Sequence, residues 1–78
     1  MKHFSIMIRS FAEVQEFVSL AMVQPFEVLV GSENHRINGK SFIGMFSLDF
    51  RQPLQVQVNC DDAAFAQFRQ QAARFLTV

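Results

Sequence analysis

Only a few side chains in this 78-residue chain could carry out chemistry directly. Two are histidines, His3 and His35, and one is the single cysteine, Cys60. An imidazole nitrogen can in principle accept a phosphoryl group, and a cysteine thiolate can act as a nucleophile. Neither histidine stands at the start of an expected helix, and Cys60 has no second cysteine or histidine near it in the sequence. We therefore expect two solvated histidines and a quiet, partly buried thiol, with no metal site and no cofactor.

The most distinctive stretch is Gly39–Leu48, which reads GKSFIGMFSL and combines a glycine, a serine and several large apolar side chains. A serine between Gly-Lys and an apolar run is typical of a helix N-cap, so Ser41 is predicted to begin a helix over residues 41–48. At about 3.6 residues per turn, the apolar side chains sweep around most of the circumference of that helix. Some of them should face water, and such a patch usually marks an interface.

Composition limits the kinds of partner. Seven Lys and Arg residues balance seven Asp and Glu residues, and no basic stripe follows the sequence. Nucleic acid binding rests on clustered cations, so we expect no nucleic acid partner. No apolar run approaches the roughly 18 residues that a membrane span needs, and the first residues do not resemble a secretory signal. With a single cysteine, these features predict a soluble cytoplasmic protein of one domain, residues 1–78.

The first half of the chain reads as a strand, a helix and a hairpin. Residues 3–9 alternate between apolar and polar side chains, as a half-buried strand does. Ser10 and Glu13 have the spacing of a capping box and predict the start of a helix, which Pro25 ends. The expected buried face of this helix comprises Phe11, Val14, Phe17, Val18, Ala21 and Met22. Strands are then expected at 26–30 and 35–38, around a turn at 31–34.

The second half adds the helix at 41–48, a strand at 54–58 and a final helix that follows Asp61 and Asp62. The expected apolar face of the last helix comprises Phe65, Phe68, Ala72, Phe75 and Leu76. The order βαββαβα predicts an α+β fold in which the helices cover one face of a mostly antiparallel sheet. The other face is expected to be open to water and to carry Ser5, Met7, Glu27, Gln55 and Gln57.

This order of elements and the Gly39–Leu48 stretch resemble the HPr family, the small histidine-containing phosphocarrier proteins of the bacterial sugar phosphotransferase system. The stretch is similar, residue by residue, to the family segment Lys-Ser-Ile-Met-Gly-Val-Met-Ser-Leu, and Glu16-Phe17-Val18 gives a weaker match. The resemblance covers most of the chain. It implies an open-faced β-sandwich, with a four-stranded antiparallel sheet and three helices on one face.

One part of the family pattern is missing. In the family, the first strand leads into a loop, Gly-Leu-His-Ala-Arg-Pro, whose histidine carries the phosphoryl group at the start of the first helix. Here only Ile8-Arg9-Ser10-Phe11-Ala12-Glu13 joins strand to helix, and Ser10 stands nearest to the place of the histidine. The carrier chemistry therefore does not transfer to this sequence.

The resemblance also implies roles for residues of the distinctive stretch. Ser41 matches the serine that a kinase modifies in the Gram-positive members, a role that is compatible with capping a helix. Phe42, Ile43 and Phe46 match exposed docking positions, and we expect at least two of them to be exposed. Lys40 is expected to join them in binding a partner, and Arg9, Lys40 and Arg51 are candidates for a small basic rim.

Three readings of function follow from these residues. The first is a regulatory or interaction module, not an enzyme, that binds a protein partner such as a regulator, a kinase or a phosphotransferase-system component. The second is a phosphocarrier that uses a non-standard residue such as His35 or Ser10. The third is an oligomerising protein whose Phe-rich helix pairs with itself. A monomer or a weak homodimer is expected.

Overall fold

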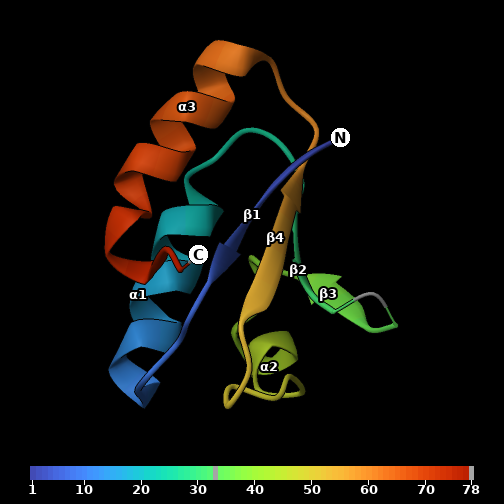
Figure 1. Ribbon diagram of the computed structural model, residues 1–78, viewed down its shortest axis with the longest axis vertical. Coiled ribbons are helices and arrows are strands. Elements are labelled where there is room, and N and C mark those ends of the chain that lie inside the picture. The colour runs from blue at the N-terminus through green and yellow to red at the C-terminus, as the bar shows by residue number, and fades with distance from the viewer. Residues whose placement is uncertain (33, 78) are drawn as a thin grey trace.

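The computed structural model describes residues 1–32 and 34–77 and shows alternating strands and helices (Figure 1). In chain order the elements are β1 (Lys2–Ile6), α1 (Phe11–Met22), β2 (Val28–Gly31), β3 (Arg36–Asn38), α2 (Phe42–Met45), β4 (Leu54–Val58) and α3 (Asp62–Gln71), followed by a 3-10 turn (Ala73–Phe75). The predicted βαββαβα order and the α+β class are confirmed. The predicted turn at 31–34 includes Glu33, which lies outside the described residues.

The four strands form one antiparallel sheet in the order β1-β4-β2-β3. Phe4, Val56 and Val30 are paired across neighbouring strands and point to the same face. Figure 1 shows α1 and α3 against this face, with α2 at the end of the sheet where β1 ends and β4 begins. The expected four-stranded antiparallel sheet with helices on one face is thereby confirmed.

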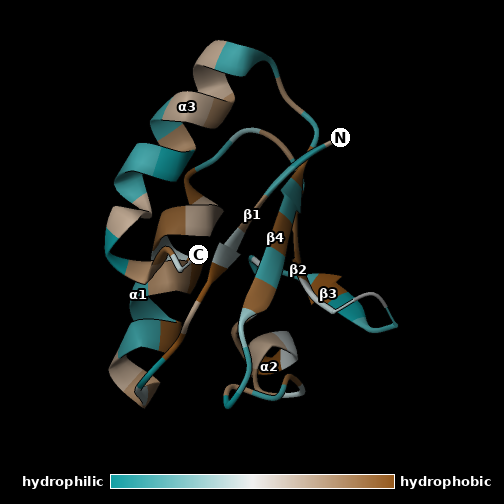
Figure 2. Ribbon diagram, in the orientation of Figure 1, coloured by the Kyte–Doolittle hydropathy of each residue, from teal (hydrophilic) through white to brown (hydrophobic). Residues whose placement is uncertain are grey.

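The core lies between this face and the helices, and phenylalanine supplies much of its volume. Phe68 of α3 is fully buried and packs against the rings of Phe4, Phe26 and Phe17, with centroids 5.7, 5.7 and 6.5 Å away. Offset and tilted rings at such separations attract one another in addition to burying apolar area. Figure 2 shows the alternation that makes this possible, with apolar and polar residues succeeding one another along β4.

The opposite face of the sheet is polar, as expected, but partly covered. His3 is exposed, whereas Ser5, Gln55 and Gln57 are half-buried because side chains on adjacent strands shield one another. Met7 and Glu27, also expected there, fall outside β1 and β2.

Two other expectations about the helices are wrong in part. Phe11 and Met22 were assigned to the buried face of α1, yet they are 60% and 62% exposed. They are the first and last residues of the helix, where the core no longer covers it. α2 is also shorter than the predicted 41–48, because the chain after Met45 continues in tight turns in which Phe46 N donates to Ile43 O and Ser47 N to Gly44 O.

No helix within residues 1–32 and 34–77 combines the length and the apolar character needed to cross a membrane.

The ring of Phe68 gives a test of the core. Phe68→Ala is expected to lower the free energy of unfolding by about 3–5 kcal/mol, because it removes a fully buried ring from a close-packed site. The matched control is Phe65→Ala on the same helix, whose half-buried ring should contribute about half as much. Urea unfolding followed by circular dichroism measures both, and equal losses would contradict the burial described here.

Candidate functional site

The distinctive stretch begins at Gly39, directly after β3. The Gly39 amide donates to Val28 O (2.7 Å), so this residue is still hydrogen-bonded to β2. A Cβ at this position would lie 2.8 Å from Val30 Cγ2 and 2.9 Å from Val28 Cγ1, so the glycine is required for the close approach. The following turn is held by Ser41 N, which donates to Asn38 O (2.9 Å).

Ser41 is the N-cap of α2, as predicted. Its backbone is extended, and its Oγ accepts a hydrogen bond from Gly44 N (3.0 Å), while Met45 N donates to Ser41 O (3.1 Å). Gly44 suits this geometry because a Cβ there would lie 3.1 Å from Ser41 Oγ. The hydroxyl of Ser41 thus has a structural role at the start of the helix.

The short helix α2 divides its apolar side chains between core and solvent. Met45 is fully buried, while Ile43 is 84% and Phe46 43% exposed. The expectation that at least two of the three docking positions are exposed is confirmed by Ile43 and Phe46. Phe42 is instead half-buried and packs against the core. We use the name docking surface for Lys40, Phe42, Ile43 and Phe46, the four residues that are expected to bind a partner.

The rings of this surface join a cluster that includes α1. Phe11 stacks on Phe46, with centroids 5.3 Å apart and planes at 29°, and meets Phe42 edge to face at 5.8 Å. Phe46 also contacts Phe42 at 5.0 Å and Phe50 at 6.2 Å. Sequence reasoning missed Phe11, because helical periodicity assigns it to the core. The one signal that could have found it is its place as the first residue after the N-cap, where core coverage ends.

The three cations proposed as a basic rim do not lie together. Lys40 Nζ donates to Gln24 O (2.8 Å) just after α1, so its charge is directed toward that loop. Arg9 and Arg51 both line a cleft. The three residues therefore do not form one basic rim.

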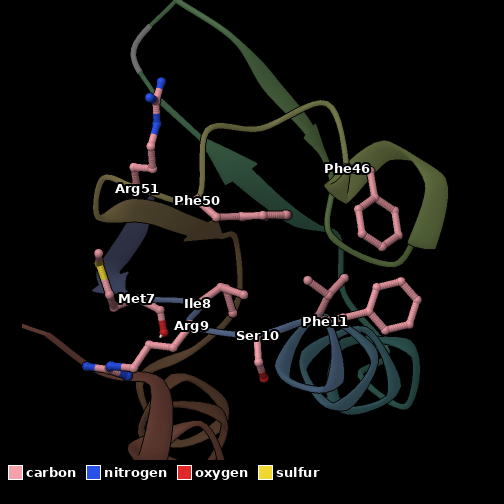
Figure 3. Close-up of a pocket in the computed structure, with 9 residues that line it drawn as sticks. Met7, Ile8, Arg9, Ser10, Phe11, Phe46, Phe50 and Arg51 are labelled. Carbon is pink, nitrogen blue, oxygen red and sulfur yellow. Dashed lines mark hydrogen bonds between the residues drawn. The ribbon is translucent and has the colours of Figure 1, made fainter.

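This cleft has a volume of about 650 Å³ and opens between the connection from β1 to α1 and the loop after α2. It is lined by residues 7–11, Val14, Phe46, Phe50 and Arg51. Figure 3 shows Phe50 extending across the cleft, Phe46 and Phe11 together at one end, and the Arg9 and Arg51 side chains directed away from the other.

Ser10, which the sequence resemblance places nearest to the family histidine, caps α1. Its Oγ accepts from Glu13 N (3.2 Å), as a capping box requires. The Glu13 carboxylate accepts from Arg9 N (2.8 Å), one residue earlier than the box predicts. The start of α1 is consequently occupied by a negative charge, which disfavours a phosphoryl group there.

Asp49 and Arg51 form an exposed ion pair at the mouth of the cleft, with Arg51 Nε 3.0 Å from Asp49 Oδ1. Hydrogen bonds from the side chain and backbone of Arg51 lower the pKa of the Asp49 carboxyl. The same side-chain hydrogen bond raises the pKa of Arg51. Both groups are therefore charged at neutral pH.

The remaining candidates for chemistry are not residues of the docking surface. His3 and His35 are exposed, as expected, and Cys60 is a half-buried free thiol. His35 Nε2 is 3.1 Å from Ser47 Oγ, which donates to Gly44 O (2.7 Å). Residues 1–32 and 34–77 contain no group of three or more His, Cys, Asp and Glu side chains placed to hold a metal ion.

Solved structures of similar architecture include two HPr-type proteins. The crystal structure of HPr-C-His from Thermoanaerobacter tengcongensis aligns with a TM-score of 0.71 at 24% identity, over 90% of this chain and 89% of that chain. The histidine-containing phosphocarrier protein of Mycoplasma aligns with a TM-score of 0.71 at 12% identity, over 99% of this chain and 100% of that chain. No protein-family model and no curated protein matches the sequence. The resemblance drawn from the sequence is confirmed at the level of architecture: this chain has the HPr fold.

Proposed function

We propose that this protein is an HPr-like regulatory or interaction module, related to the bacterial sugar phosphotransferase system, that binds protein partners through the docking surface. The exposure of Ile43 and Phe46 beside the capping serine is the observation that carries this proposal. Large apolar side chains left in water on a small protein favour an interface.

The start of α1 argues against the usual carrier role. The position nearest to the family histidine is a capping serine, and the Glu13 carboxylate lies beside it. The protein would act in the cytoplasm as a monomer or weak homodimer, without enzymatic activity of its own. Its partner would be a regulator, a kinase or a phosphotransferase-system component, and Ser41 would be the site at which phosphorylation controls binding.

A docking role requires that Phe46 contribute less to stability than a core phenylalanine. Phe46→Ala is expected to lower the free energy of unfolding by about 1–2 kcal/mol, because its ring is partly solvated but also packs against Phe11, Phe42 and Phe50. Thermal and urea unfolding measure the effect, with Phe68→Ala as the buried control. A loss as large as that of the control would mean that Phe46 is a core residue and would remove it from the docking surface.

Regulatory phosphorylation of Ser41 can be tested with a purified HPr kinase. We expect the intact mass to rise by one phosphate for the wild type and to stay unchanged for Ser41→Ala, with an authentic HPr as positive control. Phe46→Asp should reduce the rate, because a charge replaces an apolar contact of the docking surface. If the control is modified and the wild type is not, Ser41 is not a site for that class of kinase.

The phosphocarrier alternative has a direct test with enzyme I and phosphoenolpyruvate. We expect no acid-labile phosphate on this chain under conditions that label an authentic HPr, because neither histidine lies at the start of α1. If acid-labile label does appear, its loss in His35→Gln identifies His35 as the acceptor. An acid-stable label that is lost in Ser10→Ala would instead mark a serine phosphate, and either result replaces the regulatory reading with the carrier one.

A further inference from the structure

The cleft beside the docking surface is large enough to be a binding site. Its volume of about 650 Å³ falls within the roughly 300–1,000 Å³ typical of ligand pockets. Most of its wall is apolar and comes from Met7, Ile8, Phe11, Val14, Phe46 and Phe50. Of these residues only Phe46 belongs to the docking surface, so most of the cleft lies outside that surface.

The walls of the cleft favour an aromatic occupant. Phe11 and Phe46 stack at one end, and Phe46 meets Phe50 nearly edge to face, at 75°. Rings whose centroids lie about 4.5–7 Å apart in offset or edge-to-face geometry attract one another beyond their burial of apolar area. Because Phe50 extends across the cleft, a ring that enters it would meet aromatic groups on more than one side (Figure 3).

The charges around the cleft favour an uncharged occupant. Arg51 is held by Asp49 through hydrogen bonds of 3.0 and 3.3 Å, and the Glu13 carboxylate accepts from the backbone of Arg9. Arg51 is thus paired with a carboxylate, while the guanidinium of Arg9 donates to Met7 O (3.5 Å). Both side chains are directed away from the cleft (Figure 3), so a charged group that entered would lose its hydration in an apolar site without meeting either guanidinium.

Phe46 forms part of both the docking surface and the wall of the cleft. A protein segment bound on α2 could therefore reach the cleft with its next side chain. The geometry points to a specific occupant: the cleft receives an uncharged aromatic side chain, Trp or Phe, from the protein that binds the docking surface. This assignment rests on the proposed function, since it takes the occupant to belong to the docked partner.

Capped tripeptides serve as probes of the cleft. We titrate the ¹⁵N-labelled protein with acetyl-Gly-Trp-Gly-amide, acetyl-Gly-Leu-Gly-amide and acetyl-Gly-Glu-Gly-amide and follow the backbone amide resonances. The Trp peptide should produce weak, saturable shifts confined to residues 7–14 and 46–51. It should bind about three- to ten-fold more tightly than the Leu peptide, and the Glu peptide should not bind.

Two exposed side chains of α1 give a matched pair of variants. Phe11→Ala removes one aromatic ring from the wall and should lower the affinity for the Trp peptide about three- to ten-fold. Met22→Ala removes a side chain of similar exposure at the other end of the helix and should leave binding unchanged. Met7→Glu, which places a charge in the wall, should abolish binding, and the spectra of all three variants report whether the fold is kept.

Equal affinity of the Trp and Leu peptides would overturn the aromatic assignment, and binding of the Glu peptide would overturn the assignment of an uncharged occupant. Shifts spread over the whole chain, no saturable shift, or full affinity in a folded Phe11→Ala would overturn the site itself. The probes contain no phosphotransferase-system protein. Failure here is therefore separate from failure of the kinase test, which concerns the docking surface alone.

Discussion

The burial of Met45 determines how the rest of the distinctive stretch is presented. α2 has four residues, so only one side of it can enter the core, and Met45 takes that place completely. Ile43 lies on the opposite side of the helix, and its side chain is almost fully exposed to solvent. A longer helix could have rotated or tilted to bury more of its apolar residues. A single anchored turn cannot do so, and the segment therefore combines one fully buried residue with apolar side chains that stay exposed.

A second constraint acts at the other side of the phenylalanine cluster. Ile8 is buried in the core and Ser10 caps α1, so Arg9 alone separates two fixed residues. A connection of this length is too short to cover neighbouring side chains, since each residue spans at most about 3.3–3.6 Å of chain. The rings of Phe46 and Phe50 are therefore left uncovered on the side that faces this connection. The cleft is therefore a consequence of the short path from β1 to α1.

Most of the fold could be predicted from sequence because its periodic segments agree with their surroundings. The alternation of β4 matches its pairing between two strands, and the spacing of Val14, Phe17, Val18 and Ala21 matches the buried side of α1. Local patterns failed where an element ends. Phe11 continues the helical pattern but lies beyond the core, and α2 ends at Met45 because the chain turns tightly after this buried residue.

The candidate site was predictable only in part, for the same reason. Ser41 was identified as a cap from its neighbours, and the exposure of some α2 residues follows from geometry alone. The cleft depends on the approach of residues 7–11 to residues 46–51, which no local pattern encodes. The hydrogen bond from Lys40 to Gln24 O could not be predicted from local sequence either, because it depends on the packing of α1 beside the turn.

The two roles assigned to Ser41 are compatible because the cap is not the main support of α2. Loss of an N-cap hydrogen bond typically costs about 0.5–2 kcal/mol, which is a fraction of the stability of a small domain. Met45 anchors the helix from the core, on the side away from Ile43. A phosphate on Ser41 would add a charge of about −1.5 to −2 beside Phe42 and Ile43, in the middle of the apolar docking surface. The phosphate would therefore mainly change the affinity of a partner for the docking surface. The sheet and the buried Met45 would keep the segment in place.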